Sequence, residues 1–290
     1  RFGNAQWAGR VRDYTEDEVI KELKYCHSSH IINILIVQER INENNIFRLL
    51  KEDYLKDISL NGIQIQNSSP SKKQINKIAF AVDACEETAL RAVKEGADLL
   101  FVHHGLFWGH CQTITGALYK RLSVFMNNDL ALCAYHIPLD ANNPYGNNWG
   151  LANRLKMTDL QDFGYWKGMP IGVKGLLPVE MTINELAEKV VRKGCAAKNI
   201  IALGKEKIRS VGIISGGASE DVADAIEQKL DCYITGEFVH EQYHLAREMQ
   251  MNVISAGHYE TETVGPTLIM EKTKKELGLD VVFIDCPTNL

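Results

Sequence analysis

Histidines and carboxylates that could hold metal ions follow three hydrophobic segments of this 290-residue chain. They are His103 with His104, then Asp140, and then His258 with Glu262. Imidazole nitrogen binds zinc, iron, nickel and copper, whereas carboxylate oxygen also suits manganese and magnesium. Three histidines and two acids therefore predict a transition-metal site in which the identity of the metal stays open.

The spacing within each segment allows the side chains to meet. Adjacent residues of a strand point to opposite faces, so His103 and His104 can share a site only where their strand stops, and Gly105 permits that break. His258 and Glu262 are four residues apart, which places two side chains on one face of a helix. Glu262 could bridge two ions from that position.

Five protein ligands shared by two ions would leave coordination positions open, as in catalytic rather than structural metal sites. Two ions roughly 3.5–4 Å apart can activate a water and stabilise the leaving atom of a hydrolytic displacement. Hydrolysis is therefore the expected reaction class. Any one of these histidines alone is more often a hydrogen-bonded structural residue, and only the set of five favours a metal site.

Buried strands are predicted directly before the candidate ligands. Residues 98–102, 131–137 and 252–256 are apolar runs typical of strands covered on both faces. In open α/β sheets, ligands bind beyond the carboxyl ends of the strands. Predicted helices at 86–94 and 117–126 alternate with strands, which indicates βαβ crossovers and a largely parallel sheet.

The predicted fold class is α/β, with two interlinked domains whose central sheets are mainly parallel or mixed. A metal-binding domain takes residues 45–158 and 232–290, because the second pair of ligands must return to the twin histidines. Residues 159–231 form a smaller inserted α/β domain. Residues 1–44 show no signal-peptide pattern and are an N-terminal extension of unknown status.

The inserted segment contains a predicted helix and a glycine-rich loop. Thr182 and Glu185 have the spacing of a capping box at the start of a helix over 182–192. Ser215, Gly216 and Gly217 follow a predicted strand, and the N–H groups of such loops bind phosphate. The loop lacks the lysine of a P-loop and the spacing of a dinucleotide-binding motif, so a tight turn is an equal interpretation.

Composition narrows the function classes. The net charge of −5 and a pI near 6.0 argue against a broad nucleic-acid interface. Seven cysteines without a Cys-x-x-Cys pair indicate neither a disulfide framework nor a zinc ribbon, and suggest a reducing cytoplasm. The longest apolar runs fall far short of the ~20 residues that cross a bilayer.

Four motifs occur in order along the chain: ADLLFVHHGLFWG at 97–109, YHIPLD at 135–140, ITGE at 234–237 and AGHYETE at 256–262. Together they resemble the Nif-three-like dinuclear metal-centre family, also called the GTP cyclohydrolase I type 2 family, from about residue 45 onward. The resemblance implies a Nif-three-like fold assembled as a ring-shaped homohexamer. The interval from Asp140 to Thr235 is too short for the extra domain of some relatives, which makes this a short form.

The resemblance further implies that His103, His104, Asp140, His258 and Glu262 hold two divalent ions, zinc, iron or manganese, with Glu262 contacting both. The implied activity is opening of the purine ring of GTP by a metal-activated water.

The sequence gives weaker indications of the residues that would transfer protons or bind phosphate. His136, Glu260 and Glu237 are the candidate proton shuttles, and His136 could equally be a hydrogen-bond partner of a ligand. Ser215, Gly216 and Gly217 would contact the phosphates of GTP or another nucleotide.

Two alternatives stay open. One is a broader metal-dependent hydrolase, such as a phosphatase or an amidohydrolase of damaged metabolites. The other is a non-enzymatic metal-handling or scaffold protein. Fold alone does not decide among these functions.

Overall fold

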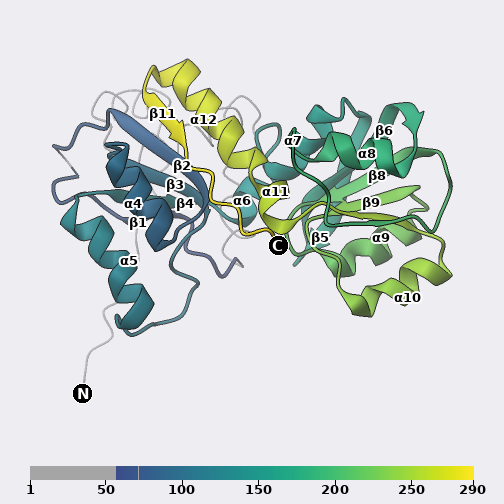
Figure 1. Cartoon of the computed structure of the whole chain (residues 1–290), viewed down its shortest axis with the longest axis horizontal. Helices are drawn as coiled ribbons and strands as arrows, with labels where there is room; N and C mark the ends of the chain where they lie inside the picture. Colours follow the sequence, from purple (N-terminus) through teal and green to yellow (C-terminus); the bar gives the residue numbers. More distant parts are fainter. Residues whose placement is uncertain (1–56, 71) are drawn as a thin grey trace.

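The computed structural model describes residues 57–70 and 72–290, which form two sheets with helices packed against them. Figure 1 shows the sheets at opposite ends of the longest axis, with α6, α11 and the C-terminal segment between them. The predicted extension at 1–44 lies outside the described residues.

The first sheet has five strands in the order β1-β4-β3-β2-β11, and all strands except β1 run parallel. In that order the strands are Gly62–Ile65, Ala131–Ala134, Leu99–His104, Lys77–Asp83 and Asp280–Phe283. Helices α4 (Glu86–Lys94) and α5 (Gly116–Asn127) cover one face. Helix α12 (Val264–Leu277) covers the other face, so the central strands are mainly apolar before their carboxyl ends.

The second sheet has six strands in the order β5-β6-β8-β9-β10-β7. In that order they are Thr158–Trp166, Met169–Met181, Ile208–Ile214, Cys232–Thr235, Asn252–Ser255 and Asn199–Ile201. Strands β8, β9 and β10 are parallel and the outer strands are antiparallel. Helices α7 (Asn147–Arg154) and α8 (Ile183–Val190) cover one face, and α9 (Val222–Glu227) and α10 (His240–Glu248) the other. The chain is therefore α/β with one largely parallel and one mixed sheet, as predicted.

The predicted domain boundary at residue 232 does not coincide with the boundary between the sheets. Strands β9 and β10 pair in parallel with each other, and β9 pairs with β8, so they belong to the second sheet. The chain rejoins the first sheet only through α12 and β11. A fully buried parallel strand has the same apolar composition in either sheet, so its sequence does not reveal which neighbours it joins.

Two short helices carry the chain between the sheets. Helix α6 (Ile137–Asp140) follows β4, and helix α11 (His258–Glu262) follows β10. The predicted strand at 131–137 ends earlier, at Ala134, and Pro138 lies in the first turn of α6, where its fixed φ and missing N–H suit a helix. Among the described residues, no helix combines the length and apolar character needed to span a bilayer.

Candidate metal centre

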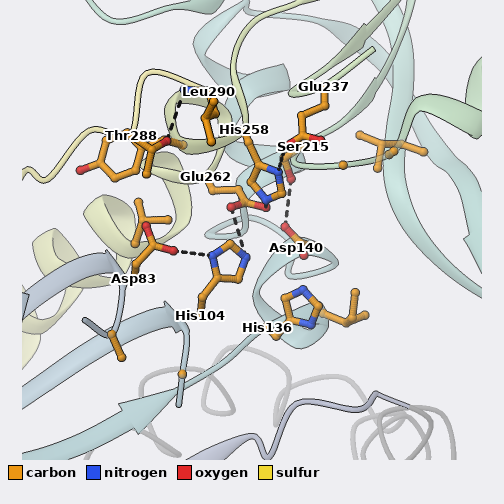
Figure 2. A pocket seen from close by; sticks show the side chains of 18 of the residues that line it. Asp83, His104, His136, Asp140, Ser215, Glu237, His258, Glu262, Thr288 and Leu290 are labelled. Carbon is orange, nitrogen blue, oxygen red and sulfur yellow. Dashed lines mark hydrogen bonds and ion pairs between the residues drawn. The ribbon is translucent and has the colours of Figure 1, made fainter. Parts of the chain in front are cut away.

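Strand β3 and helix α11 bring the predicted ligands together between the two sheets (Figure 2). The Nε2 atom of His104 lies 3.3 Å from Oε2 of Glu262, and Nε2 of His258 lies 3.2 Å from Oε1. The Nε2 atom of His103 lies 3.4 Å from Oε1 of Glu262 and 3.5 Å from Oδ2 of Asp140. The structure thus gathers all five residues around the Glu262 carboxylate.

The potential ligand atoms form overlapping groups. One group contains His103, Asp140 and Glu262, and another contains His104, His258 and Glu262. Within each group, the ligand atoms lie within 4.8 Å of one another. Because Glu262 belongs to both, its two oxygens face both groups. A third group joins His103 and His104 to His136.

The end of β3 explains how two adjacent histidines reach one site. The ring centroids of His103 and His104 are 4.5 Å apart. A Cβ atom on Gly105 would lie 2.3 Å from the Gln64 side chain, so glycine lets Gln64 approach. The Oε1 atom of Gln64 accepts a hydrogen bond of 2.7 Å from the Leu106 N–H. The strand therefore stops after His104, as the sequence predicts.

In each of the three candidate ligand histidines, Nδ1 contacts an oxygen atom and Nε2 faces the carboxylates. The Nδ1 contacts are His103 with the Tyr135 carbonyl at 2.9 Å, His104 with Asp83 at 2.8 Å and His258 with Glu237 at 2.6 Å. Metal-binding histidines commonly use this arrangement, because the partner fixes both the tautomer and the ring orientation. A carbonyl can only accept, so His103 carries a proton on Nδ1 and can offer a lone pair at Nε2.

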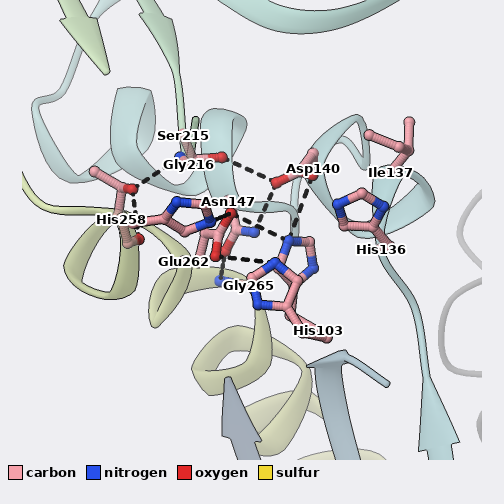
Figure 3. A network of polar contacts seen from close by, with 12 residues as sticks. His103, His136, Ile137, Asp140, Asn147, Ser215, Gly216, His258, Glu262 and Gly265 are labelled. Atoms are coloured by element: carbon pink, nitrogen blue, oxygen red, sulfur yellow. Dashed lines mark hydrogen bonds and ion pairs between the residues drawn. The ribbon is translucent and has the colours of Figure 1, made fainter. Parts of the chain in front are cut away.

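Helix α7 and the loop after β8 hold Asp140 (Figure 3). Its Oδ1 atom accepts hydrogen bonds from Asn147 Nδ2 at 2.8 Å and from Ser215 Oγ at 2.9 Å. Asn147 also accepts the Gly265 N–H at 2.7 Å, which ties the start of α12 to the same point. The other oxygen, Oδ2, is left facing His103.

Two buried atoms of the centre make no hydrogen bond within the described part of the chain. They are His103 Nε2 and Glu262 Oε2, which have only the ion-pair contacts of 3.3–3.5 Å given above. His103 is fully buried and the side chain of Glu262 is 4% exposed. An unsatisfied buried polar group costs about 1–3 kcal/mol, so a native protein normally gives it a partner. A nitrogen lone pair and a carboxylate oxygen are both ligands for divalent transition metals, so these residues fit such an ion.

The acids also control the charge of the histidines. Burial alone would lower the pKa of His103, but the Asp140 and Glu262 carboxylates outweigh it and raise this pKa to about 10. At His258, burial would also lower the pKa, but Glu262 and Glu237 outweigh it and raise the pKa to about 9. Burial would raise the pKa of Glu262, but His103 and His104 hold it well below its usual range. In metal-free protein, a second proton on His103 and on His258 thus balances the buried carboxylate, and a bound metal ion would replace it at Nε2.

His136 lies beside the centre and lines the same cavity as His104. Its ring centroid is 5.2 Å from that of His103, and its Nδ1 lies 3.1 Å from Oδ1 of Asp57. The Asp57 side chain is fully buried and also accepts hydrogen bonds from Ser59 N–H and Asn61. Burial would raise the pKa of Asp57, but the bonds from His136 and Asn61 lower it overall.

The structure does not bring Glu260 to the site, in contrast to the prediction of a proton shuttle there. Its Oε1 accepts the Arg192 backbone N–H at 2.6 Å, and its Oε2 accepts Arg192 Nε at 2.9 Å. Two residues along a helix turn the side chain by roughly 200°, so Glu260 points away from the face that holds His258 and Glu262. Glu237 does reach the cavity, where it bonds to His258.

The glycine-rich loop supports the ligands instead of presenting free donors. The Ser215 N–H donates to Asn148 at 2.6 Å, and the Gly216 N–H donates to Thr261 at 3.1 Å. The N–H groups of Ser215 and Gly216 are thus used within the protein, while Ser215 and Gly217 both line the cavity, and the predicted phosphate contacts stay a prediction. Gly216 has φ +66°, and a Cβ there would lie 2.3 Å from Glu262 Oε1, so glycine is required by the close approach of the carboxylate.

A cavity of about 840 Å³ extends from the centre. Besides the ligands, its wall includes acids at Asp83, Asp221 and Glu237 and indole rings at Trp108 and Trp166. Arg121 is the only lysine or arginine among the described residues that line it. The cavity is therefore mostly apolar and acidic, with one fixed positive charge.

Sequence analysis missed several residues that hold the ligands in place. Asp83 is the last residue of β2 and lies beside β3, so the rule that sites form at carboxyl ends of parallel strands could have identified it. Asp57, Asn147 and Asn148 lie in loops or in a short helix, where residue spacing gives no comparable signal.

Comparison with known proteins shows a consistent group of relatives. The family pattern described as Duf34/NIF3 (NGG1p interacting factor 3) matches residues 42–289. A "GTP cyclohydrolase 1 type 2 homolog" of Treponema pallidum is 38% identical and aligns over 81% of this chain and 92% of its own length. A protein of the same name from Deinococcus radiodurans is 40% identical over 86% of this chain and 95% of its own length.

Solved structures with the same architecture include protein ybgI, which has 30% identity and a TM-score of 0.76, covering 93% of this chain and 99% of that one. TTHA1606 from Thermus thermophilus has 32% identity and a TM-score of 0.73, covering 87% of this chain and 99% of its own. Sequence and fold thus point to one family.

Proposed function

Because this chain belongs to the Duf34/NIF3 family, we propose that it is a hydrolase dependent on two divalent metal ions. The proposed ligands are His103, His104, Asp140, His258 and Glu262, with Glu262 shared between the ions. When bound, the ions would activate a water and stabilise the leaving group of a hydrolytic displacement.

The observation that carries this proposal is the arrangement around Glu262. Three Nε2 atoms face its carboxylate, while each Nδ1 is held by an oxygen partner. Two of the atoms in this cluster, His103 Nε2 and Glu262 Oε2, are buried without a hydrogen bond. A purely structural cluster would be expected to satisfy these atoms internally.

His136 is the proposed proton carrier. Asp57 holds its Nδ1, and the ring lies against the cavity with 21% of its side chain exposed. The residue can therefore exchange protons with a bound substrate while keeping a fixed orientation. Glu237, which bonds to His258, is the remaining candidate for this role.

The specific version of the proposal is opening of the purine ring of GTP. It rests on the names of the relatives, which are called GTP cyclohydrolase 1 type 2 homologs. A second candidate is a broader metal-dependent hydrolase, a phosphatase or an amidohydrolase of damaged metabolites, whose substrate carries less charge than the triphosphate of GTP. The internal hydrogen bonds of Ser215 and Gly216 favour it, because they leave Arg121 as the one permanent cation among the described residues that line the cavity.

Metal loading and product release test the proposal together. Metal-free protein is loaded with zinc, manganese or iron, and bound metal is measured by mass spectrometry of the digested sample. We expect two ions per chain, and we expect formate to be released from GTP. The variant Glu262→Gln should bind at most one ion per chain, whereas Glu271→Gln, an exposed change on α12, should bind two.

The outcomes separate the alternatives. Fewer than one ion per chain in the unmodified protein would refute the centre. Two ions without formate from GTP would refute the cyclohydrolase version, and a panel of phosphate esters and amides would then test the broader hydrolase. Two ions with no turnover of any substrate would support a metal-handling role.

A further inference from the structure

One end of the cavity has the character of a binding site for a flat ring. Its wall there contains Trp166 at the end of β5, Ile171 on β6, and Ile214 at the end of β8. Lys167 Nζ lies 4.2 Å from the Trp166 ring centroid and covers one of its faces. The carboxylate of Asp221 also lines the cavity and lies near Ile214. Ligand sites often combine apolar walls with a few polar groups that set orientation.

Asp221 has no salt bridge among the residues that the structure describes. The hydrogen bond that lowers its pKa comes from its own backbone N–H. Burial and the neighbouring Asp224 and Glu220 outweigh that bond and raise the pKa to about 6. The carboxylate is therefore ionised at neutral pH without a cationic partner, which is unfavourable for a half-buried group.

The backbone around Asp221 fixes this position. The residue ends a short 3-10 helix, Ser219–Asp221, directly before α9. A Cβ added to Gly164, which has φ +60°, would lie 2.2 Å from Ile214 Cδ1 and 3.6 Å from Asp221 Oδ1. Glycine in β5 thus leaves room for the Ile214 side chain, and the Asp221 carboxylate lies beside it at an ordinary contact distance.

We propose that Asp221 recognises the edge of a heterocycle that presents two adjacent N–H donors, as guanine does, and that it determines specificity at this site. The proposal rests on the proposed function, because it names the substrate class of the same cavity. The two oxygens of one carboxylate can accept from the N1–H and the N2 amino group of guanine in parallel. Adenine presents an acceptor at N1 and would face the carboxylate unfavourably.

Recognition of the base by Asp221 does not require a separate phosphate-binding site. The N–H groups of Ser215 and Gly216 are used within the protein, and Arg121 is the one arginine or lysine that lines the described cavity. The base is therefore expected to contribute more of the selectivity than the phosphates. A nucleoside is the appropriate probe, because it isolates the contact with the base.

Binding of three nucleosides to zinc-loaded protein tests the proposal. Guanosine offers both donors, inosine offers only N1–H, and adenosine lacks N1–H. Dissociation constants are measured by equilibrium dialysis, with chromatography to confirm that the ligand is intact. We expect guanosine to bind about 10- to 100-fold more tightly than adenosine, with inosine between them. Asp221→Asn should remove most of this preference and strengthen adenosine binding, because the amide can donate to adenine N1 where the carboxylate cannot.

The matched control is Glu220→Gln, an exposed change on the same 3-10 helix that should keep the preference for guanosine. Circular dichroism and metal content verify that Asp221→Asn remains folded and loaded. Equal affinity for the three nucleosides, or an unchanged preference in Asp221→Asn, would overturn the proposal. Selective guanosine binding without any hydrolysis would instead refute the proposed function and leave the recognition intact.

Discussion

At the scale of single residues, Asp221 couples its protonation to folding. Its pKa is about 6 in the folded chain and 3.8 ordinarily. A carboxyl whose folded pKa is raised binds its proton more tightly in the folded state, so its contribution to stability is present at low pH and is lost as pH rises through about 6. The ionised form then destabilises the fold by about 1–2 kcal/mol, after allowance for solvent screening.

Replacing Asp221 with asparagine should remove this loss. We expect Asp221→Asn to be more stable than the unmodified chain by about 1–2 kcal/mol at pH 8, and the difference to shrink toward pH 5. Urea unfolding in the presence of a chelator measures it without a contribution from bound metal. The control Glu227→Gln, exposed on α9, should show no such trend. A constant difference between pH 5 and 8 would exclude the linkage.

Residue types and spacing predicted which side chains lie together at the centre. They did not predict which residues of the same motifs are directed away from it. Histidines that follow apolar strands, together with an acid four residues after His258, were enough to predict the cluster around Glu262. Glu260 lies in the same motif, yet the opposite face of a one-turn helix directs it to Arg192. Gly216 is a glycine because Glu262 approaches it closely, which no local pattern distinguishes from a phosphate-binding loop.

At the scale of elements, α8 shows a local rule that decides where a helix begins. Thr182 Oγ1 accepts the Glu185 N–H at 3.3 Å, and Glu185 Oε2 accepts the Thr182 N–H at 2.7 Å. The predicted capping box is confirmed, because it depends only on residues three apart. Strand partners depend on residues far apart in sequence, and β9 and β10, which were predicted to lie in the first domain, pair within the second sheet.

The cap gives a prediction for α8. Thr182→Ala should lower the free energy of unfolding by about 1 kcal/mol, because the first turn loses its side-chain acceptor. Chemical denaturation with chelator present measures the change. Thr113→Ala, in an exposed loop before α5, should change stability by less than about 0.5 kcal/mol. A Thr182→Ala variant as stable as this control would mean that packing of the apolar face alone holds α8.

At the scale of the whole molecule, the candidate centre joins the two sheets. Two of its ligands end β3 of the first sheet, Asp140 ends the short helix α6, and His258 with Glu262 begin and end α11 after β10 of the second sheet. The C-terminal segment makes a second connection, because Asp285 follows β11 and accepts hydrogen bonds from Arg192 and Tyr259. The predicted homohexamer and cytoplasmic location stay predictions, since neither is visible in one chain.

Removal of the metal should therefore destabilise the contacts between the two sheets more than the strand pairing within either sheet. A ligand that binds only the folded state stabilises it by about 2.7 kcal/mol at a hundredfold excess over its dissociation constant. We expect a chelator to lower the melting temperature of zinc-loaded protein, and hydrogen exchange to increase at the end of β3, at α6 and at α11. Exchange in the central strands β2 and β8 should change little. Glu262→Gln should show a smaller change of melting temperature on addition of chelator, because it lacks the shared ligand and binds at most one ion per chain. If zinc-loaded protein keeps its melting temperature in chelator while its metal is lost, the ions do not hold the two sheets together.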